Sequence, residues 1–257
     1  MPEAVLKTPE QELIVGQVPR VVGTLTSFPD DFQQFEHESD IVEVRFDEVT
    51  QRDNWIQRCK SIEAGGPPVL LTVRLCSEGG KWPDADEGRL PIFQQALEHL
   101  AAVDVEFRCS IARRVSDVAK SLNKTCIVSY HDFDGTPSVT DLQSVISKAQ
   151  KLGSIVKIST MINTGKDIQT LQSLLQGGWD VPLCVIGMGS LGTDTRISFA
   201  HLGSCLTYGY LDKPTAPGQL SAADLVRKLR SQFPVFDQDF IGRKQVSRAN
   251  PRIRAKG

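Results

Sequence analysis

The chain has 257 residues, of which 40% are hydrophobic and 23% are charged, and its formal net charge is −2 at pH 7. This length suits one large α/β barrel or two small domains, with enough apolar residues for a sizeable core. The small charge argues against a nucleic-acid or membrane-surface partner, since both usually require a basic field. No stretch approaches the roughly 20 apolar residues of a membrane-spanning helix, and the first residues do not resemble a secretory signal.

Cysteine usage points to a reducing compartment. The six cysteines are widely spaced, and no two of them form a CxxC pair. Most lie within apolar runs, so we expect buried, reduced thiols in a cytoplasmic protein. The four histidines do not cluster with cysteines at ligand spacing, and we therefore expect no metal site.

Short apolar runs recur along the chain and are predicted to be strands. Most are nearly continuous in their apolar character, which is typical of parallel strands buried on both faces. They cover residues 21–26, 41–46, 69–74, 103–107, 125–130, 155–160, 182–188 and 205–210.

Amphipathic helices are predicted between these strands, because apolar residues recur there at helical spacing. The pattern is clear over residues 142–152 and is repeated in four other segments. Those segments are 92–100, 111–122, 168–175 and 225–233. Gly153 and the pair Gly177 and Gly178 follow two of the helical patterns and indicate where the helices stop.

Eight strands, each followed by a helix, predict an α/β fold of the (β/α)8 TIM-barrel class, as a single domain over residues 1–234. A doubly wound open sheet is the competing layout. No GxGxxG follows the first strand, which weakens a nucleotide-binding interpretation. Residues 235–257 are predicted to be a short, basic and mobile C-terminal tail.

Polar residues gather at or just after the carboxyl ends of the predicted strands, where a barrel enzyme carries its chemistry. They are Glu43, Arg45, Asp47, Arg74, Glu78, Asp104, Glu106, His131, Asp132, Lys157 and Arg196. Barrel cores normally hold Val, Ile and Leu, so this convergence is more typical of an active site than of packing. A network of structural ion pairs is the alternative interpretation.

Lys157 is the most informative of these residues, because it interrupts the apolar run 155–159. Burying an ammonium group is costly unless the group is paired or loses its charge. As a neutral amine, the side chain would attack a ketone to form a Schiff base. A buried ion pair between the lysine and an acid is the structural alternative.

Other polar residues could complete such chemistry on a ketone. The iminium acidifies the adjacent C–H, and His131 could remove that proton while Glu78 fixes the imidazole tautomer. Arg74 and Arg196 could hold a substrate carboxylate through paired hydrogen bonds. Together these residues indicate a small anionic hydroxy-ketone as the substrate.

Six segments of the chain carry a family resemblance. They cover residues 43–47, 72–74 with 78–80, 129–133 with 136–138, 156–158, 188–190 with 196, and 203–204 with 216–219. Each motif alone is weak, but in this order and spacing they resemble the type I 3-dehydroquinate dehydratases of the shikimate pathway. The resemblance extends over nearly the whole chain.

The resemblance implies a lyase that converts 3-dehydroquinate to 3-dehydroshikimate, the third step of chorismate and aromatic amino acid biosynthesis. It assigns the Schiff base to Lys157, general acid and base catalysis to His131, and orientation of that histidine to Glu78. It also implies that substrate contacts come from Glu43, Arg45, Arg74, Met188, Arg196, Thr215 and Gln219. Among these, Arg196 would hold the carboxylate and Gln219 would lie on a lid.

The resemblance further implies a cytoplasmic homodimer without a cofactor, because the lysine itself supplies the electron sink. One position departs from the family pattern, since Thr215 stands where the family usually has serine. Threonine keeps the hydroxyl group and adds a methyl group, so a modest effect on lid fit or on substrate affinity is expected.

Two other functions remain open at this point. One is a Schiff-base barrel aldolase acting on a sugar phosphate, which would need a glycine-rich phosphate nest after the seventh and eighth strands. The other is a barrel that binds a metabolite without turnover. Such a binding protein would not need both Lys157 and His131, and this chain has both.

Overall fold

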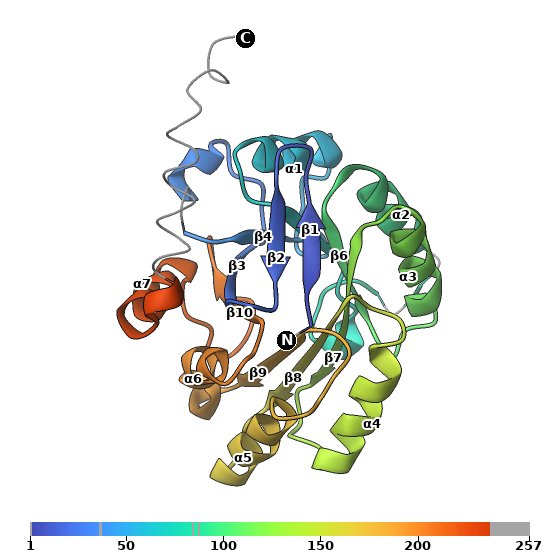
Figure 1. Ribbon diagram of the computed structural model, residues 1–257. Coiled ribbons are helices and arrows are strands. Elements are labelled where there is room, and N and C mark those ends of the chain that lie inside the picture. The colour runs from blue at the N-terminus through green and yellow to red at the C-terminus, as the bar shows by residue number, and fades with distance from the viewer. Residues whose placement is uncertain (1, 36–37, 84, 87, 237–257) are drawn as a thin grey trace.

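The computed structural model describes residues 2–35, 38–83, 85–86 and 88–236. Eight parallel strands form one sheet, in the order β10-β3-β4-β5-β6-β7-β8-β9. At the seam between β9 and β10, the Cys205 N–H donates to the Leu183 carbonyl over 3.0 Å, so the sheet nearly closes on itself. The predicted (β/α)8 barrel is confirmed (Figure 1).

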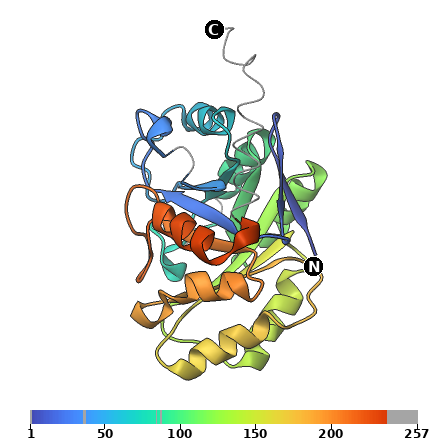
Figure 2. The ribbon, with the colours of Figure 1, turned by 60° about the vertical axis from the view of Figure 1, so that its left-hand side comes forward.

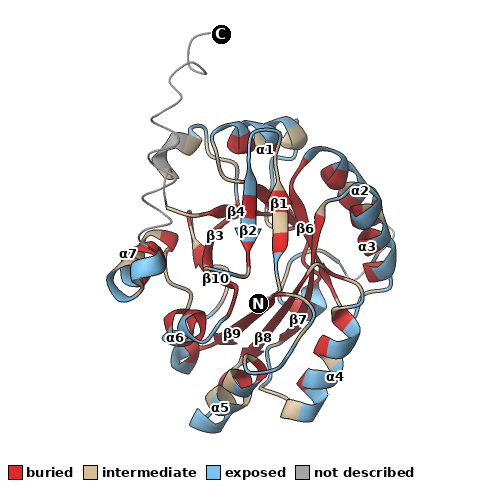
Figure 3. Cartoon of the chain, viewed as in Figure 1, coloured by how far each residue is buried: buried red, intermediate tan, exposed pale blue. Residues whose placement is uncertain are grey.

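All eight predicted strands are present. They are β3 (Arg20–Leu25), β4 (Ile41–Arg45), β5 (Val69–Thr72), β6 (Ala102–Glu106), β7 (Thr125–Asp132), β8 (Ile155–Met161), β9 (Leu183–Met188) and β10 (Leu206–Tyr210). Nearly every residue in them is buried, because the barrel interior covers one face and the helices cover the other (Figure 3).

Helices surround the barrel. They are α1 (Trp55–Ala64), α2 (Leu90–His99), α3 (Ala112–Ser121), α4 (Val139–Ala149), α5 (Gly165–Leu174), α6 (Thr195–His201) and α7 (Ala222–Gln232). Short 3-10 turns are η1 (Phe32–Phe35), η2 (Cys76–Glu78) and η3 (Ser190–Gly192). No helix in the described ranges is long and apolar enough to cross a membrane.

The first connection of the barrel differs from the prediction that a helix follows every strand. Between β3 and β4, the described residues hold only the turn η1. Pro29 with Asp30 and Asp31 opens this short connection, and such residues favour turns over a continuous helix.

An N-terminal hairpin, which was not predicted, covers the amino-terminal end of the barrel. Its strands β1 (Ala4–Lys7) and β2 (Glu12–Val15) pair antiparallel and bury alternate apolar residues against the barrel floor. Arg20 Nε and Thr125 Oγ1 donate to carbonyls of this hairpin, each over 2.9 Å. Figures 1 and 2 show the hairpin lying over one end of the ring of strands.

The barrel interior changes from apolar to polar within a single step of two residues. The floor beside the hairpin contains Ile41, Leu70, Ala102, Ile127, Ile155, Cys184 and Leu206. Two residues further along each of these strands, on the same face, stand the polar Glu43, Thr72, Asp104, Ser129, Lys157 and Tyr208, and on β9 the apolar Ile186. The fold therefore sets the polar groups on an apolar floor at the carboxyl ends of the strands.

The predicted C-terminal tail lies almost wholly outside the described residues, which end at 236. Helix α7 ends at Gln232, and Phe236 is fully buried in the main core cluster. The division between the barrel and the tail stays a prediction.

Candidate active site

One pocket at the carboxyl ends of the strands brings together every predicted site residue. It is lined by Glu43, Arg45, Arg74, Glu78, His131, Lys157, Met188, Arg196, Thr215 and Gln219. Thr24, Gly79, Phe133, Ser159, Ile186, Tyr208 and Ala216 complete its wall. These residues come from seven of the eight barrel strands, all but β6, or from the segments that follow them, so only the closed barrel can assemble them.

Lys157 lies in the middle of β8 with only 5% of its surface exposed. Its Nζ is 3.2 Å from Asp104 Oδ2 and 4.1 Å from the centre of the Tyr208 ring. The ion pair that was weighed as the structural alternative is therefore present. It leaves the amine at the pocket wall, where a ketone can reach it.

Asp104 is shared between two cations. Its Oδ1 accepts hydrogen bonds from Arg74 Nη2 at 2.8 Å and from Ser129 Oγ at 2.6 Å, while Oδ2 faces Lys157. Burial alone would raise the pKa of this carboxyl group. Arg74 and Lys157 outweigh that cost and hold the pKa of Asp104 well below its usual range.

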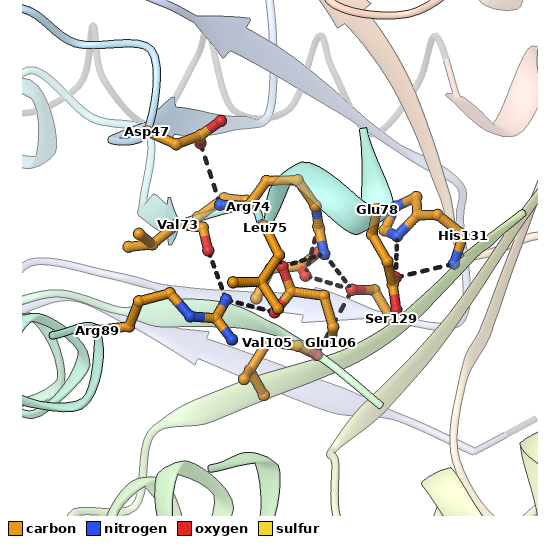
Figure 4. Close-up of polar contacts among 12 residues, drawn as sticks. Asp47, Val73, Arg74, Leu75, Glu78, Arg89, Val105, Glu106, Ser129 and His131 are labelled. Atoms are coloured by element: carbon orange, nitrogen blue, oxygen red, sulfur yellow. Dashed lines mark hydrogen bonds and ion pairs between the residues drawn. The ribbon is translucent and has the colours of Figure 1, made fainter. Parts of the chain in front are cut away.

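His131 and Glu78 form a tightly coupled pair. Glu78 Oε2 lies 2.9 Å from His131 Nδ1 and also accepts the His131 backbone N–H over 3.1 Å (Figure 4). With Glu78 ionised, the proton of the imidazole sits on Nδ1, and Nε2 is left as the base.

The electrostatics of this pair keep the imidazole uncharged. Burial, followed by the nearby charges of Arg74 and Lys157, lowers the pKa of His131 well below its ordinary value. Burial raises the pKa of Glu78 to about 7, although Arg74 opposes this shift. A neutral imidazole held in one orientation is the form that a general base requires.

Side chains hold Glu78 in place where the backbone ladder stops. The last pair between β5 and β6 is Thr72 with Asp104. Beyond it, the Arg74 N–H donates to Asp47 Oδ1 over 3.1 Å, and the Leu75 N–H donates to Glu106 Oε1 over 3.0 Å. Carboxylates thus replace strand partners and turn the chain toward η2.

Arg89 stabilises the turn between β5 and η2 from the outer side of the barrel. It is fully buried, and its Nη1 donates to the Val73 carbonyl at 2.7 Å and to Glu106 Oε2 at 2.5 Å. Figure 4 shows Arg89 pointing toward Glu106, with Arg74 on the other side of that carboxylate. Gly80 completes the turn, because a Cβ there would lie 2.1 Å from the Arg74 carbonyl oxygen.

The guanidinium of Arg74 is occupied by the protein itself. It contacts Asp104 at 2.8 Å, Ser129 at 2.8 Å and Glu106 at 3.2 Å. This geometry favours the interpretation that Arg74 joins the strand interiors and sets the charge near Lys157. Its predicted contact with a substrate is favoured less.

Arg196, at the start of α6, is in the opposite situation. Its Nη1 and Nε donate to main-chain carbonyls, with Nη1 at 3.0 Å from Tyr208 O and Nε at 3.3 Å from Gly218 O. Among the described residues, no carboxylate lies within ion-pair distance of it, and burial lowers its pKa to about 10. A buried cation without an acid attracts an anionic ligand.

The loop after β10 closes one side of the pocket. The Gly189 N–H donates to the Pro217 carbonyl over 3.2 Å. Gly218 has φ +71°, and a Cβ at this position would clash with the Gly189 carbonyl oxygen. Within the loop, Gln219 Oε1 accepts from Thr215 N at 2.7 Å and from Thr215 Oγ1 at 3.1 Å. This leaves the amide NH2 of Gln219 as its free donor group.

Glu43 and Arg45 are fixed by neighbours on adjacent strands or turns. Glu43 accepts from Thr24 Oγ1 at 2.9 Å and from Thr72 Oγ1 at 2.8 Å. Arg45 pairs with Asp47 through two bonds of 3.0 and 2.7 Å. Asp47 is therefore a partner of Arg45, and Asp104 and Glu106 are partners of Arg74.

Comparison with known families decides the family. The family model described as type I 3-dehydroquinase matches residues 18–234. The chain belongs to the type I 3-dehydroquinase family.

Individual relatives agree with this assignment. The chain is 32% identical to the 3-dehydroquinate dehydratase of Methanocella arvoryzae over 212 residues, which are 82% of this chain and 96% of that protein. The crystal structure of the 3-dehydroquinate dehydratase from Aquifex aeolicus is similar, with a TM-score of 0.73 and 26% identity over 83% of this chain and 98% of that one. The Clostridium difficile type I enzyme, solved with covalently modified comenic acid, has the same fold, with a TM-score of 0.79 at 22% identity over 90% of this chain and 98% of that one.

Some residues of this pocket were not predicted from the sequence. Tyr208, Ser159 and Thr24 line the pocket but were not predicted as site residues. Their signal was present in the alternation of the strands, because Ser159 follows Lys157 by two residues and Tyr208 lies on the inward face of β10. Hydroxyl and aromatic groups at such positions look like core residues until their neighbours are known.

Proposed function

We propose that this chain dehydrates 3-dehydroquinate to 3-dehydroshikimate through a Schiff base on Lys157. One observation carries the proposal: a single pocket holds an amine, an oriented neutral imidazole and a buried arginine that has no acid partner among the described residues. Membership of the type I 3-dehydroquinase family and the names of the relatives support the same reaction.

The reaction proceeds by covalent catalysis. The neutral amine of Lys157 adds to the C3 ketone, and loss of water gives an iminium that withdraws electrons from the adjacent C–H bond. His131 Nε2 takes the C2 proton, and the resulting imidazolium protonates the C1 hydroxyl as it leaves as water. Water then hydrolyses the conjugated iminium, which releases product and restores the lysine.

Substrate recognition is divided among the remaining pocket residues. Arg196 binds the carboxylate, and the NH2 group of Gln219 closes over the ring from the lid while Thr215 holds its carbonyl oxygen. Glu43 and Arg45 contact the ring hydroxyls, and Met188 supplies an apolar surface beside the imine. Arg74 contributes through Asp104 rather than as a direct clamp.

In the cell, we place the protein in the cytoplasm as a homodimer, at the third step of chorismate and aromatic amino acid biosynthesis. This placement rests on the family alone. Gel filtration with light scattering would test the dimer.

The competing aldolase has less support from the geometry. An aldolase that acts on sugar phosphates needs backbone N–H groups collected around a phosphate. Here the Gly189 N–H already donates to the Pro217 carbonyl, and the charge available at this edge is the buried Arg196. A carboxylate fits that arrangement better.

The direct test is turnover of purified protein with 3-dehydroquinate, followed by the appearance of the conjugated enone of the product. We expect steady turnover by the wild type and none by Lys157→Ala. Binding of 3-dehydroquinate without turnover would favour the metabolite-binding barrel. Conversion of a sugar phosphate instead would favour the aldolase.

A further inference from the structure

Tyr208 has no role in the reaction described above, although it lies against its central residue. The tyrosine is 4% exposed, lines the pocket, and stands on the inward face of β10. Lys157 Nζ is over its ring, 4.1 Å from the centroid. An ammonium group within about 6 Å of a ring centre is attracted by the negative face of the aromatic system.

The ring, and not the hydroxyl group, is the part of Tyr208 that meets the lysine. In the described structure, the Tyr208 hydroxyl is buried without a hydrogen-bond partner. An aromatic residue whose hydroxyl is unsatisfied gains nothing at this position from its polar end. Its contribution to the pocket is therefore the ring face.

Other groups face Lys157 from the strands around it and could also affect the charge of its nitrogen. They are Asp104 on β6, Ser129 and His131 on β7, and Cys184 on β9, with Glu43 and Arg74 further out on β4 and after β5. Among the described residues, Asp104 is the one carboxylate in contact with Lys157, and its bond with Arg74, at 2.8 Å, is shorter than its contact with Lys157, at 3.2 Å. The ring face of Tyr208 is the other group in contact that attracts a positive charge on the Lys157 nitrogen.

We propose that the ring of Tyr208 is the cation-binding surface for the Lys157 nitrogen and keeps that nitrogen positively charged once the iminium has formed. This inference rests on the proposed Schiff-base function. An imine withdraws electrons efficiently only while its nitrogen is protonated, and hydride reduction also requires the protonated form. The ring stabilises the iminium against loss of that proton, because the ring quadrupole attracts the cation and not the neutral imine.

Two substitutions separate the ring from the hydroxyl. Tyr208→Phe keeps the ring face, whereas Tyr208→Leu fills part of the same space with an apolar side chain that cannot bind a cation. Borohydride trapping with 3-dehydroquinate is measured for both variants and for the wild type across pH 6–10, together with the pH dependence of kcat. Circular dichroism and thermal unfolding establish that each variant is folded.

We expect the alkaline limb of trapping and of kcat to move to lower pH in Tyr208→Leu by about half a unit to one and a half units, the range of cation–π strength. Tyr208→Phe should keep the wild-type limb to within about 0.3 units, because its ring is retained. A merely structural role would change yield or melting temperature without moving the limb.

Two outcomes would overturn the inference. The first is a Tyr208→Leu profile with the wild-type limb, and the second is a Tyr208→Phe profile that shifts as far as the leucine variant, which would assign the effect to the hydroxyl. If the wild type itself traps no adduct, the Schiff-base function fails, and that result is distinct from either outcome.

Discussion

At the scale of single residues, the pairing of His131 with Glu78 makes the rate of the reaction fall at acidic pH. The pKa of His131 is lowered well below its usual value, so the imidazole stays an uncharged base throughout the neutral range. The pKa of Glu78 is raised to about 7, so this carboxyl group gains a proton as the pH falls through 7 and no longer accepts from Nδ1–H. The acidic limb of the rate therefore belongs to Glu78.

We predict that kcat falls below pH 7 in the wild type. Glu78→Gln should lower kcat by about 100-fold at neutral pH, because general base catalysis depends on an oriented imidazole. It should also abolish the limb near pH 7, since the amide does not titrate. A pH profile of both proteins checks this, and a limb that persists in the variant would assign the titration to another group.

Arg196 gives a prediction about binding at the same scale. Arg196→Gln should raise KM by about 10- to 100-fold, the strength of a hydrogen bond to a charged group, with a smaller effect on kcat. The matched control is a substrate analogue in which the carboxylate is replaced by a carboxamide. Its affinity should respond far less to the substitution. Equal losses for both ligands would show that Arg196 does not bind the carboxylate.

At the scale of elements, the exit of the chain from β5 depends on buried ion pairs more than on backbone pairing. Arg89 bonds Val73 and Glu106, and Glu106 in turn holds Leu75 and Arg74. Removing Arg89 would leave a buried carboxylate with one cation fewer. The turn that carries Glu78 would lose its outer anchor.

We predict that Arg89→Met lowers the free energy of unfolding by about 3–5 kcal/mol, the cost of breaking a buried pair. Lys81→Ala is the control, because its ion pair with Glu48 is on the surface, where Lys81 is 61% exposed, and such pairs contribute about 0–1 kcal/mol. Urea unfolding of both variants measures the difference. Similar losses in the two would contradict a structural role for the buried network.

The parts of these elements that could be predicted from the sequence were those that depend on local residue patterns. The strands were found because buried parallel strands are continuous apolar runs, and the ends of those runs located the polar residues. The first connection was not predicted correctly, because every strand was expected to be followed by a helix. The sequence could not decide whether Arg74 binds the substrate or joins the strands, because its partners Asp104 and Glu106 lie on the next strand.

At the scale of the whole molecule, the barrel is a polar site built on an apolar floor that the N-terminal hairpin seals. The hairpin escaped prediction because strands of four residues, with two inward side chains each, give a weak alternating pattern. Tyr208 was not predicted as a site residue for a different reason. Only the closed barrel places its ring against Lys157, because β8 and β10 lie close together only across the seam between β9 and β10.

We predict that Leu6→Ala lowers the free energy of unfolding by about 2–5 kcal/mol without changing kcat or KM. Leu6 is 1% exposed in the floor cluster, at the end of the barrel opposite the pocket. Ile14→Ala, on the outer face of the same hairpin at 38% exposure, should cost about 0.5 kcal/mol or less. A change in KM for Leu6→Ala would contradict the separation of floor and site.

The central claim is that Lys157 forms a covalent imine with the substrate, and borohydride reduction in the presence of 3-dehydroquinate tests it most directly. Peptide mass analysis should find the reduced adduct on the peptide that contains Lys157, with matching loss of activity and no adduct in Lys157→Ala. An adduct on another lysine, or none from an enzyme that turns the substrate over, would contradict the account.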